Sequence, residues 1–226
     1  MKKIMLLFIS CLVSIFFIGC TDKEVEDNTL YIEKAVLTEE EDNIIKLLGT
    51  EFDNSIFDFK VDDTVKSIYL TYYTLEDGKW IPDLGESKYS FKDTEGRIAI
   101  TFNNLDNGHR EALQSKSVNS SSTHYPEEKN IEEIGVTNSY LSDKKEIVYE
   151  EEIPLVIQIL TNKNEVKSYN VDYFYSPEVY AEEGYEKVYA ITVKFSQNEI
   201  SDTNSENTDL YKPEATSDKK FIYLNS

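Results

Sequence analysis

The feature that most constrains the fold is an alternation of large apolar residues with other residues that recurs along the chain. It is clearest in IFDFKV (56–61), VKSIYLTYY (65–73), GRIAITF (96–102) and VYAITVKF (188–195). A period of two is typical of β-strands that turn one face toward a core. The chain also contains 16 Tyr and 11 Phe, which favour strands. We therefore expect an all-β fold.

Turn signals divide these segments at intervals typical of an antiparallel β-sandwich. Asp77-Gly78 predicts a two-residue hairpin just before Trp80, and Asn107-Gly108 predicts a second turn. Strands do not alternate with long helices, which argues against a parallel sheet. We expect the sandwich to span residues 30–196 and a polar, disordered tail to follow over 197–226.

Two helical segments are expected beside the strands. Thr38 and Glu41 have the spacing of a capping box, which predicts one short N-terminal helix that ends near Gly49. Ser176 as a cap and Pro177 at the first helical position predict a single helical turn.

Three other segments lead to weaker expectations. We expect strands over EIVYEEE (146–152) and EVKSYNVDYFY (165–175), and a long loop over the Ser-rich residues 115–130. A partial match between 65–73 and 166–174 leaves open whether two related β halves, 30–114 and 131–196, form one sandwich or two.

The N-terminal segment has the pattern of an export signal. Lys2 and Lys3 precede an apolar run that extends to Gly19. The ending Phe17-Ile18-Gly19-Cys20 resembles the lipobox of bacterial lipoproteins, and the chain as a whole resembles uncharacterised lipoproteins of low-GC Gram-positive bacteria. An ordinary secretory signal with an incidental cysteine is the alternative.

The lipobox resemblance implies where the chain is located. It implies removal of residues 1–19 and diacylglycerol on Cys20, with acyl chains such as palmitate holding the chain on the outer face of the bacterial cytoplasmic membrane. Two acyl chains are enough for stable anchoring. Residues 20–29 would then form the acylated end and a flexible tether. Cys11 lies in the signal, so no thiol remains for a disulfide, a nucleophile or a cysteine metal site.

Charge and motifs exclude several classes of function. A net charge of −20 disfavours nucleic acid as a partner. Motifs for nucleotide binding, serine hydrolases and zinc proteases are absent from the sequence. His109 and His124 fall in predicted loops, where a solvated imidazole is the default, so we assign no catalytic residue, no metal site and no cofactor.

Aromatic residues are the better candidates for binding. The stretches TYYTLEDGKW (71–80) and VDYFYSPEVY (171–180) concentrate rings that can stack on sugars or anchor a protein, unless they simply fill the core. The candidate ligand-binding residues are Tyr72, Tyr73, Trp80, Tyr173 and Tyr175.

These observations favour a non-catalytic surface lipoprotein that binds a wall component, a glycan or a protein. An extracellular glycan hydrolase whose catalytic carboxylates are not identified is one alternative. A structural subunit of an envelope complex is the other.

Overall fold

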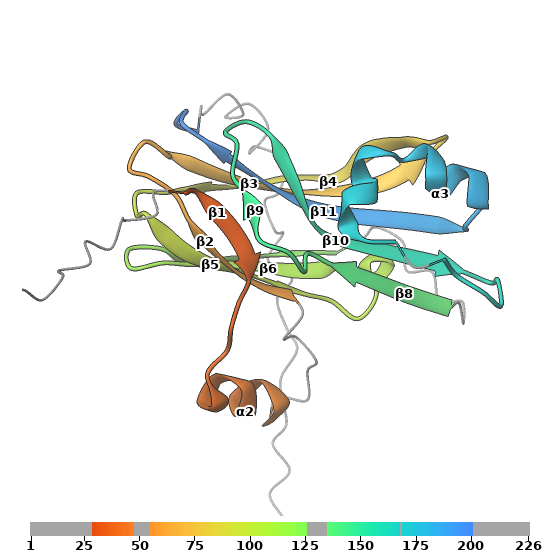
Figure 1. Cartoon of the computed structure of the whole chain (residues 1–226), viewed down its shortest axis with the longest axis horizontal. Coiled ribbons are helices and arrows are strands. Elements are labelled where there is room, and N and C mark those ends of the chain that lie inside the picture. The colour runs from red at the N-terminus through yellow and green to blue at the C-terminus, as the bar shows by residue number, and fades with distance from the viewer. Residues whose placement is uncertain (1–28, 48–54, 126–134, 168, 201–226) are drawn as a thin grey trace, which may run out of the picture.

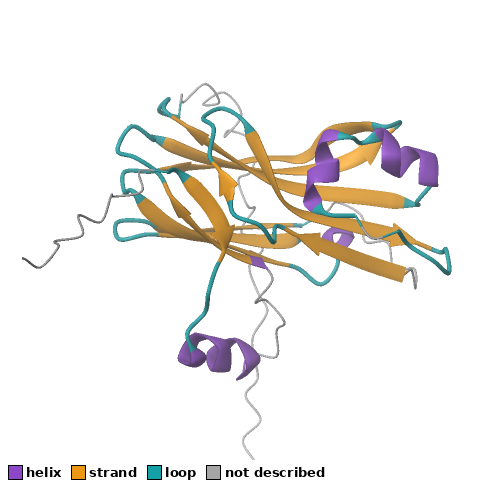
Figure 2. Ribbon diagram, viewed as in Figure 1, coloured by secondary structure: helices purple, strands orange, loops and turns teal. Residues whose placement is uncertain are grey.

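Two antiparallel sheets packed face to face form the fold in the computed structural model of the chain (Figure 1; Figure 2). The structure describes residues 29–47, 55–125, 135–167 and 169–200. The predicted all-β sandwich is confirmed. The predicted signal segment, tether and tail lie wholly or mostly outside the described residues.

The larger sheet has six strands, and it contains both short N-terminal strands. Its spatial order is β7 (Asn119–His124), β6 (His109–Gln114), β5 (Glu95–Thr101), β2 (Ile56–Lys60), β1 (Tyr31–Lys34) and β9 (Lys145–Glu146). A short 3₁₀ helix, η3 (Leu105–Asn107), precedes β6.

The smaller sheet has five strands, with β11 at its centre. Its spatial order is β4 (Lys79–Ser90), β3 (Ser67–Glu76), β11 (Lys187–Ser196), β10 (Glu152–Thr161) and β8 (Gly135–Tyr140). Each sheet takes strands from both predicted halves, since β1 pairs with β9 and β3 pairs with β11. The two halves therefore do not form separate sheets.

The core lies between the sheets and follows the predicted alternation. Ile68, Leu70 and Tyr72 of β3 are buried, as are Ile98 and Ile100 of β5. Burial of such side chains removes about 25 cal/mol of unfavourable hydration per Å² of apolar surface, which makes this face the main source of stability.

The β3–β4 hairpin has the predicted turn. Asp77 and Gly78 both have positive φ, 48° and 72°, and Glu76 pairs directly with Lys79. This is the geometry of a two-residue type I′ turn, which matches the twist of the strands on either side. The turn fixes the place of Trp80 on β4.

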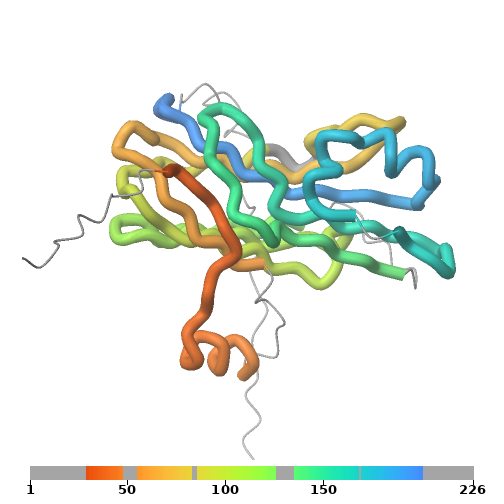
Figure 3. Tube along the Cα trace, viewed as in Figure 1, coloured from red at the N-terminus to blue at the C-terminus, as the bar shows by residue number. Residues whose placement is uncertain are grey.

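The N-terminal helix α2 (Glu39–Leu47) has the predicted capping box. Thr38 N donates to Glu41 Oε2 at 2.7 Å, and Glu41 N donates to Thr38 Oγ1 at 3.2 Å. Figure 3 shows α2 standing away from both sheets, and none of its residues is buried. Within the described residues, no helix is long and apolar enough to span a membrane.

Two of the predicted strands are wrong. Residues 171–175 form the 3₁₀ helix η4 (Val171–Tyr175), because the Asn170 side chain accepts a hydrogen bond from Asp172 N and starts a tight turn. Within 146–152, Glu150 has a φ of 64°, so the chain turns there and only β9 and the first residue of β10 are extended.

The partial match between 65–73 and 166–174 is not a structural repeat. The first segment belongs largely to β3, whereas the second leads into η4.

Two loop predictions also need correction. Residues 119–124 of the expected loop form β7, which pairs along its whole length with β6, and residues 126–130 lie outside the described part of the chain. Both histidines therefore lie in strands. Helix α3 (Glu178–Glu183) is present, but the predicted cap is wrong. Pro177 and not Ser176 is the N-cap residue, and no side chain makes a capping hydrogen bond.

Candidate functional site

An outer aromatic cluster forms where η4 and the β3–β4 hairpin meet, on the side of the five-stranded sheet away from the core. Its rings belong to Tyr73, Trp80, Tyr169, Tyr173, Phe174, Tyr175 and Tyr180. The two aromatic stretches singled out in the sequence thus meet in space. Figure 1 shows the segment that carries η4 and α3 lying over this end of the sheet.

Phe174 is the centre of this outer cluster. Trp80 stacks on it with the ring centroids 5.2 Å apart, and Trp80 Nε1 donates to the Phe174 carbonyl at 2.8 Å. Tyr73 is tilted against the same ring at 5.7 Å, and its hydroxyl donates to Glu152 Oε1 at 2.6 Å. Trp80 and Tyr73 therefore hold η4 onto the sheet and are only partly exposed.

Two rings of the outer cluster remain open to solvent. The exposed fraction is 41% for Tyr173 and 61% for Tyr175. The Tyr175 hydroxyl donates to the Glu152 carbonyl at 2.7 Å. Partial burial and the charges of Asp172, Glu151 and Glu152 raise the pKa of Tyr175, so its hydroxyl stays protonated beside these acids.

Tyr72 is the one predicted binding residue that lies elsewhere. It is 3% exposed and stacks on His109 of the opposite sheet with the ring centroids 5.1 Å apart. Adjacent residues of a strand point to opposite faces, so Tyr72 enters the core while Tyr73 faces outward.

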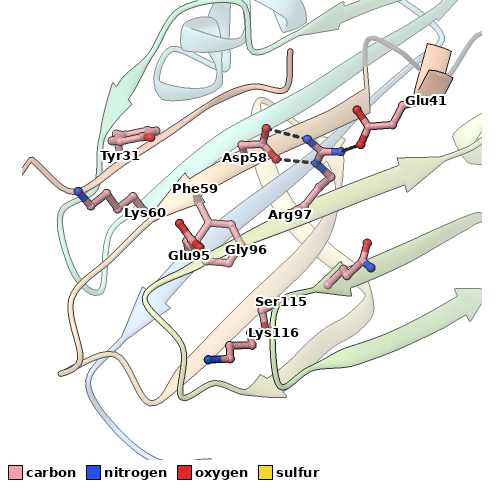
Figure 4. A pocket seen from close by; sticks show the side chains of 11 residues that line it. Tyr31, Glu41, Asp58, Phe59, Lys60, Glu95, Gly96, Arg97, Ser115 and Lys116 are labelled. Atoms are coloured by element: carbon pink, nitrogen blue, oxygen red, sulfur yellow. Dashed lines mark hydrogen bonds and ion pairs between the residues drawn. The ribbon is translucent and has the colours of Figure 1, made fainter. Parts of the chain in front are cut away.

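A pocket of about 550 Å³ opens on the outer side of the six-stranded sheet, around Arg97 (Figure 4). Arg97 Nε and Nη2 donate to the two oxygens of Asp58 at 2.6 and 3.0 Å, and Nη1 donates to Glu41 Oε1 at 2.7 Å. Asp58 and then Glu41 raise the pKa of Arg97. Because two carboxylates already engage the guanidinium, we interpret this pocket as the joint between α2 and the sheet.

A second, polar cluster lies inside the sandwich, between the edge strands β4 and β7. We call Ser87, His109, Glu111 and His124 the histidine–glutamate cluster. His109 and Glu111 are two residues apart on β6, and both face the interior. The β6–β7 register places His124 directly opposite His109. Ser87 reaches the cluster from β4 of the other sheet.

The distances within this polar cluster are short. His109 Nε2 lies 3.0 Å from Glu111 Oε1, and His124 Nε2 lies 3.5 Å from Glu111 Oε2. The two imidazoles are stacked with centroids 4.7 Å apart, and Ser87 Oγ is 2.9 Å from His124 Nε2.

Burial sets the electrostatics of the polar cluster. The side chains of His109 and Glu111 are at most 1% exposed, and that of His124 is 18% exposed. Burial favours a neutral Glu111, yet the contacts with His109 and His124 lower its pKa to about 2. The contact with Glu111 raises the pKa of His124. Burial and the Glu111 charge raise the pKa of the nearby Tyr89 to about 12.

The polar cluster is not a catalytic triad. In a triad, serine and the carboxylate contact different nitrogens of one imidazole. Here Ser87 and Glu111 both approach Nε2 of His124. The arrangement therefore gathers donor atoms around one point and does not relay a proton.

Sequence reasoning missed the polar cluster, although one signal was present. His109-Arg110-Glu111 at the start of an alternating segment places the imidazole and the carboxylate on one face. The position of His124 required a strand over NSSSTH (119–124), whose residues have low β propensity.

Comparison of the chain with protein-family models, with curated proteins and with solved structures found no match. The geometry of the two clusters is therefore what points to a function for this chain.

Proposed function

We propose that this chain is a lipid-anchored protein on the outer face of a bacterial cytoplasmic membrane, and that its β-sandwich binds a wall glycan without catalysing a reaction. The anchor is diacylglycerol on Cys20. The export-signal pattern of residues 1–19 and the lipobox resemblance support this location.

The observation that carries the binding proposal is the pair of exposed rings at the edge of the outer aromatic cluster. Tyr173 and Tyr175 flank Phe174 in the sequence, and Phe174 is held in place because it packs against Trp80. Tyrosine rings offer flat apolar faces to the C–H faces of sugars, and pre-ordered rings lose little conformational freedom on binding.

The groups around these rings favour a neutral glycan over an anionic polymer. Asp172, Glu151 and Glu152 lie close enough to raise the pKa of Tyr175. Carboxylates accept hydrogen bonds from sugar hydroxyls and repel phosphate and carboxylate groups. The net charge of −20 acts in the same direction.

The anchor is tested by labelling with radioactive palmitate and by partition between detergent and water. We expect the wild-type chain to be labelled and to enter the detergent phase, and Cys20→Ala to lose the label. Cys11→Ala is the matched control, because it removes the other cysteine and should keep the label. A labelled Cys20→Ala chain would refute the anchor.

The binding proposal is tested with soluble wall fragments and neutral oligosaccharides on the full chain in detergent. Because Trp80 is the only tryptophan, its fluorescence reports the outer cluster directly. We expect Tyr175→Ala and Tyr173→Ala each to weaken binding about tenfold.

Tyr125→Ala is the control for the glycan experiment, since Tyr125 is 73% exposed and follows β7 of the other sheet. Equal effects of all three substitutions would refute the proposed surface. Absence of glycan binding, together with cross-linking of a protein to Tyr175, would replace the glycan by a protein partner.

A further inference from the structure

We propose that the histidine–glutamate cluster is a binding site for a divalent transition-metal ion, with zinc the best match. His109 Nε2, Glu111 and His124 Nε2 supply the ligands, and Ser87 occupies the side nearest the other sheet. This inference does not depend on the glycan proposal, because its ligands lie on β6 and β7 of the six-stranded sheet and face the interior of the sandwich.

The first support is the choice and spacing of donor atoms. Two imidazoles and one carboxylate are a known ligand set for zinc and for other first-row metals. In a tetrahedral zinc site with bonds of about 2.0–2.1 Å, ligand atoms lie about 3.3 Å apart. Here His109 Nε2 lies 3.0 Å from Glu111 Oε1 and His124 Nε2 lies 3.5 Å from Glu111 Oε2. One ligand atom from each of the three residues can be chosen so that all three lie within 4.8 Å of one another.

The second support is an unsatisfied group at the centre of the site. Glu111 is 1% exposed, and its Oε2 accepts no hydrogen bond of normal geometry from the described residues. An ionised carboxylate with a free oxygen is costly in a protein interior. A bound cation would use that oxygen and offset the charge.

The third support is access. β7 is the edge strand of its sheet and β4 is the edge strand of the other, so the cluster lies at the seam between them. The side chain of His124 is 18% exposed, whereas that of His109 is fully buried. An ion can therefore reach His124 first and then enter between His109 and Glu111.

The nitrogen donors also define which ions should be rejected. Calcium and magnesium prefer sites made entirely of oxygen, whereas imidazole suits zinc, copper, nickel and iron. Ser87 is neutral and adds no charge, so the site supplies a single negative charge from Glu111. Selectivity for zinc over calcium separates this site from the many exposed acids of the chain.

The test uses untagged full-length protein in detergent, freed of metal with a chelator and titrated with zinc by calorimetry. We expect one ion per chain, a higher melting temperature with zinc, and no comparable effect of calcium or magnesium. Glu111→Gln and His124→Gln should each weaken zinc binding at least tenfold. Glu86→Gln is the matched control, because Glu86 lies on β4 beside Ser87 and points to the outer face.

A second measurement needs no variant. His109 and His124 are the only histidines of the chain, so imidazole ¹⁵N signals report this site alone. We expect one equivalent of zinc to shift the Nε2 signals of both rings. Zinc that binds without shifting these signals sits on surface carboxylates, and that result would refute the proposal, as would the absence of zinc binding.

Discussion

The outer aromatic cluster and the histidine–glutamate cluster pack against opposite faces of strand β3 and have opposite compositions. Tyr73 faces outward and packs on Phe174, whereas its neighbour Tyr72 faces inward and stacks on His109. The outer cluster is aromatic and partly exposed. The histidine–glutamate cluster, the inner cluster of the two, is ionisable and almost fully buried.

The difference shows what each cluster contributes to folding. The outer rings bury apolar surface, so each buried ring should stabilise the fold. The inner cluster places an ionised glutamate where a β-sandwich normally has aliphatic side chains, and such groups cost stability unless fully paired. Stability can explain the outer cluster, but it does not explain the inner one.

The largest expected effect tests the outer cluster. Phe174→Ala removes the ring that Tyr73, Trp80 and Tyr175 all contact. It should lower the free energy of unfolding by about 3–5 kcal/mol. Guanidinium unfolding followed by Trp80 fluorescence measures this loss. Tyr173→Ala, at an exposed ring, should cost less than about 1 kcal/mol, and equal losses would contradict the central role of Phe174.

The next effect tests the inner cluster in metal-free protein. Glu111→Leu leaves the buried imidazole of His109 without its hydrogen-bond partner and should cost about 2 kcal/mol of unfolding free energy. Replacing His109, Glu111 and His124 together by leucine should instead leave stability unchanged or raise it by about 1–4 kcal/mol.

Guanidinium unfolding of both inner-cluster variants without zinc provides the comparison. A triple variant that is less stable than Glu111→Leu would mean that the inner cluster serves folding rather than binding.

The sequence allowed the two ring-rich stretches of the outer cluster to be singled out because each is local, but it did not predict that they meet. Asp77-Gly78 defines the hairpin that carries Tyr73 and Trp80, and four more rings of the cluster are crowded into VDYFYSPEVY (171–180). The strand predicted for residues 171–175 of that second stretch is nevertheless wrong. Asn170 starts a 3₁₀ turn through a side-chain hydrogen bond, which outweighs the strand propensity of the tyrosines.

The inner cluster could not be predicted in the same way because it depends on register. His124 reaches His109 only if residues 119–124 pair with β6, and their side chains give little reason to form a strand. β7 pairs with the edge of β6 that β5 does not cover, and Asp93 accepts hydrogen bonds from Ser115 and Ser117 in the β6–β7 loop. Two strands of different sheets, β4 and β7, must also meet so that Ser87 contacts His124, and no periodicity specifies this.

A smaller effect tests the hairpin of the outer cluster. Gly78 has a φ of 72°, where a β-carbon is strained, and a β-carbon added there would lie 3.6 Å from Ala181 Cβ. Gly78→Ala should therefore lower the free energy of unfolding by about 1 kcal/mol. Asp77→Asn is the control, because asparagine is favoured in this turn and should be neutral or slightly stabilising. Equal losses of stability in the two variants would mean that the positive φ of Gly78 is not the cause.

The smallest effect tests the β6–β7 hairpin, which carries both histidines of the inner cluster. Asp93 Oδ2 accepts hydrogen bonds from Ser115 Oγ at 2.5 Å, from Ser117 N at 2.8 Å and from Ser117 Oγ at 2.6 Å. These bonds hold the β6–β7 loop and so the register that pairs His109 with His124. Asp93→Ala should speed amide hydrogen exchange within 115–124 and weaken zinc binding a few-fold, whereas Glu95→Ala, at an exposed acid two residues away, should do neither.

The hydrogen bonds of Asp93 with the β6–β7 loop depend on pH. The hydrogen bonds from Ser115 and Ser117 lower the pKa of Asp93 in the folded chain relative to its ordinary value of 3.8. The loop is therefore held at any pH above that ordinary value, and it is released as the pH falls through the lowered one. Amide exchange in 115–124, corrected for its intrinsic pH dependence, should rise in this acid range in the wild type but not in Asp93→Ala. An identical acid response in both proteins would show that the register is set by strand pairing alone, and the loop would then have no part in assembling the inner cluster.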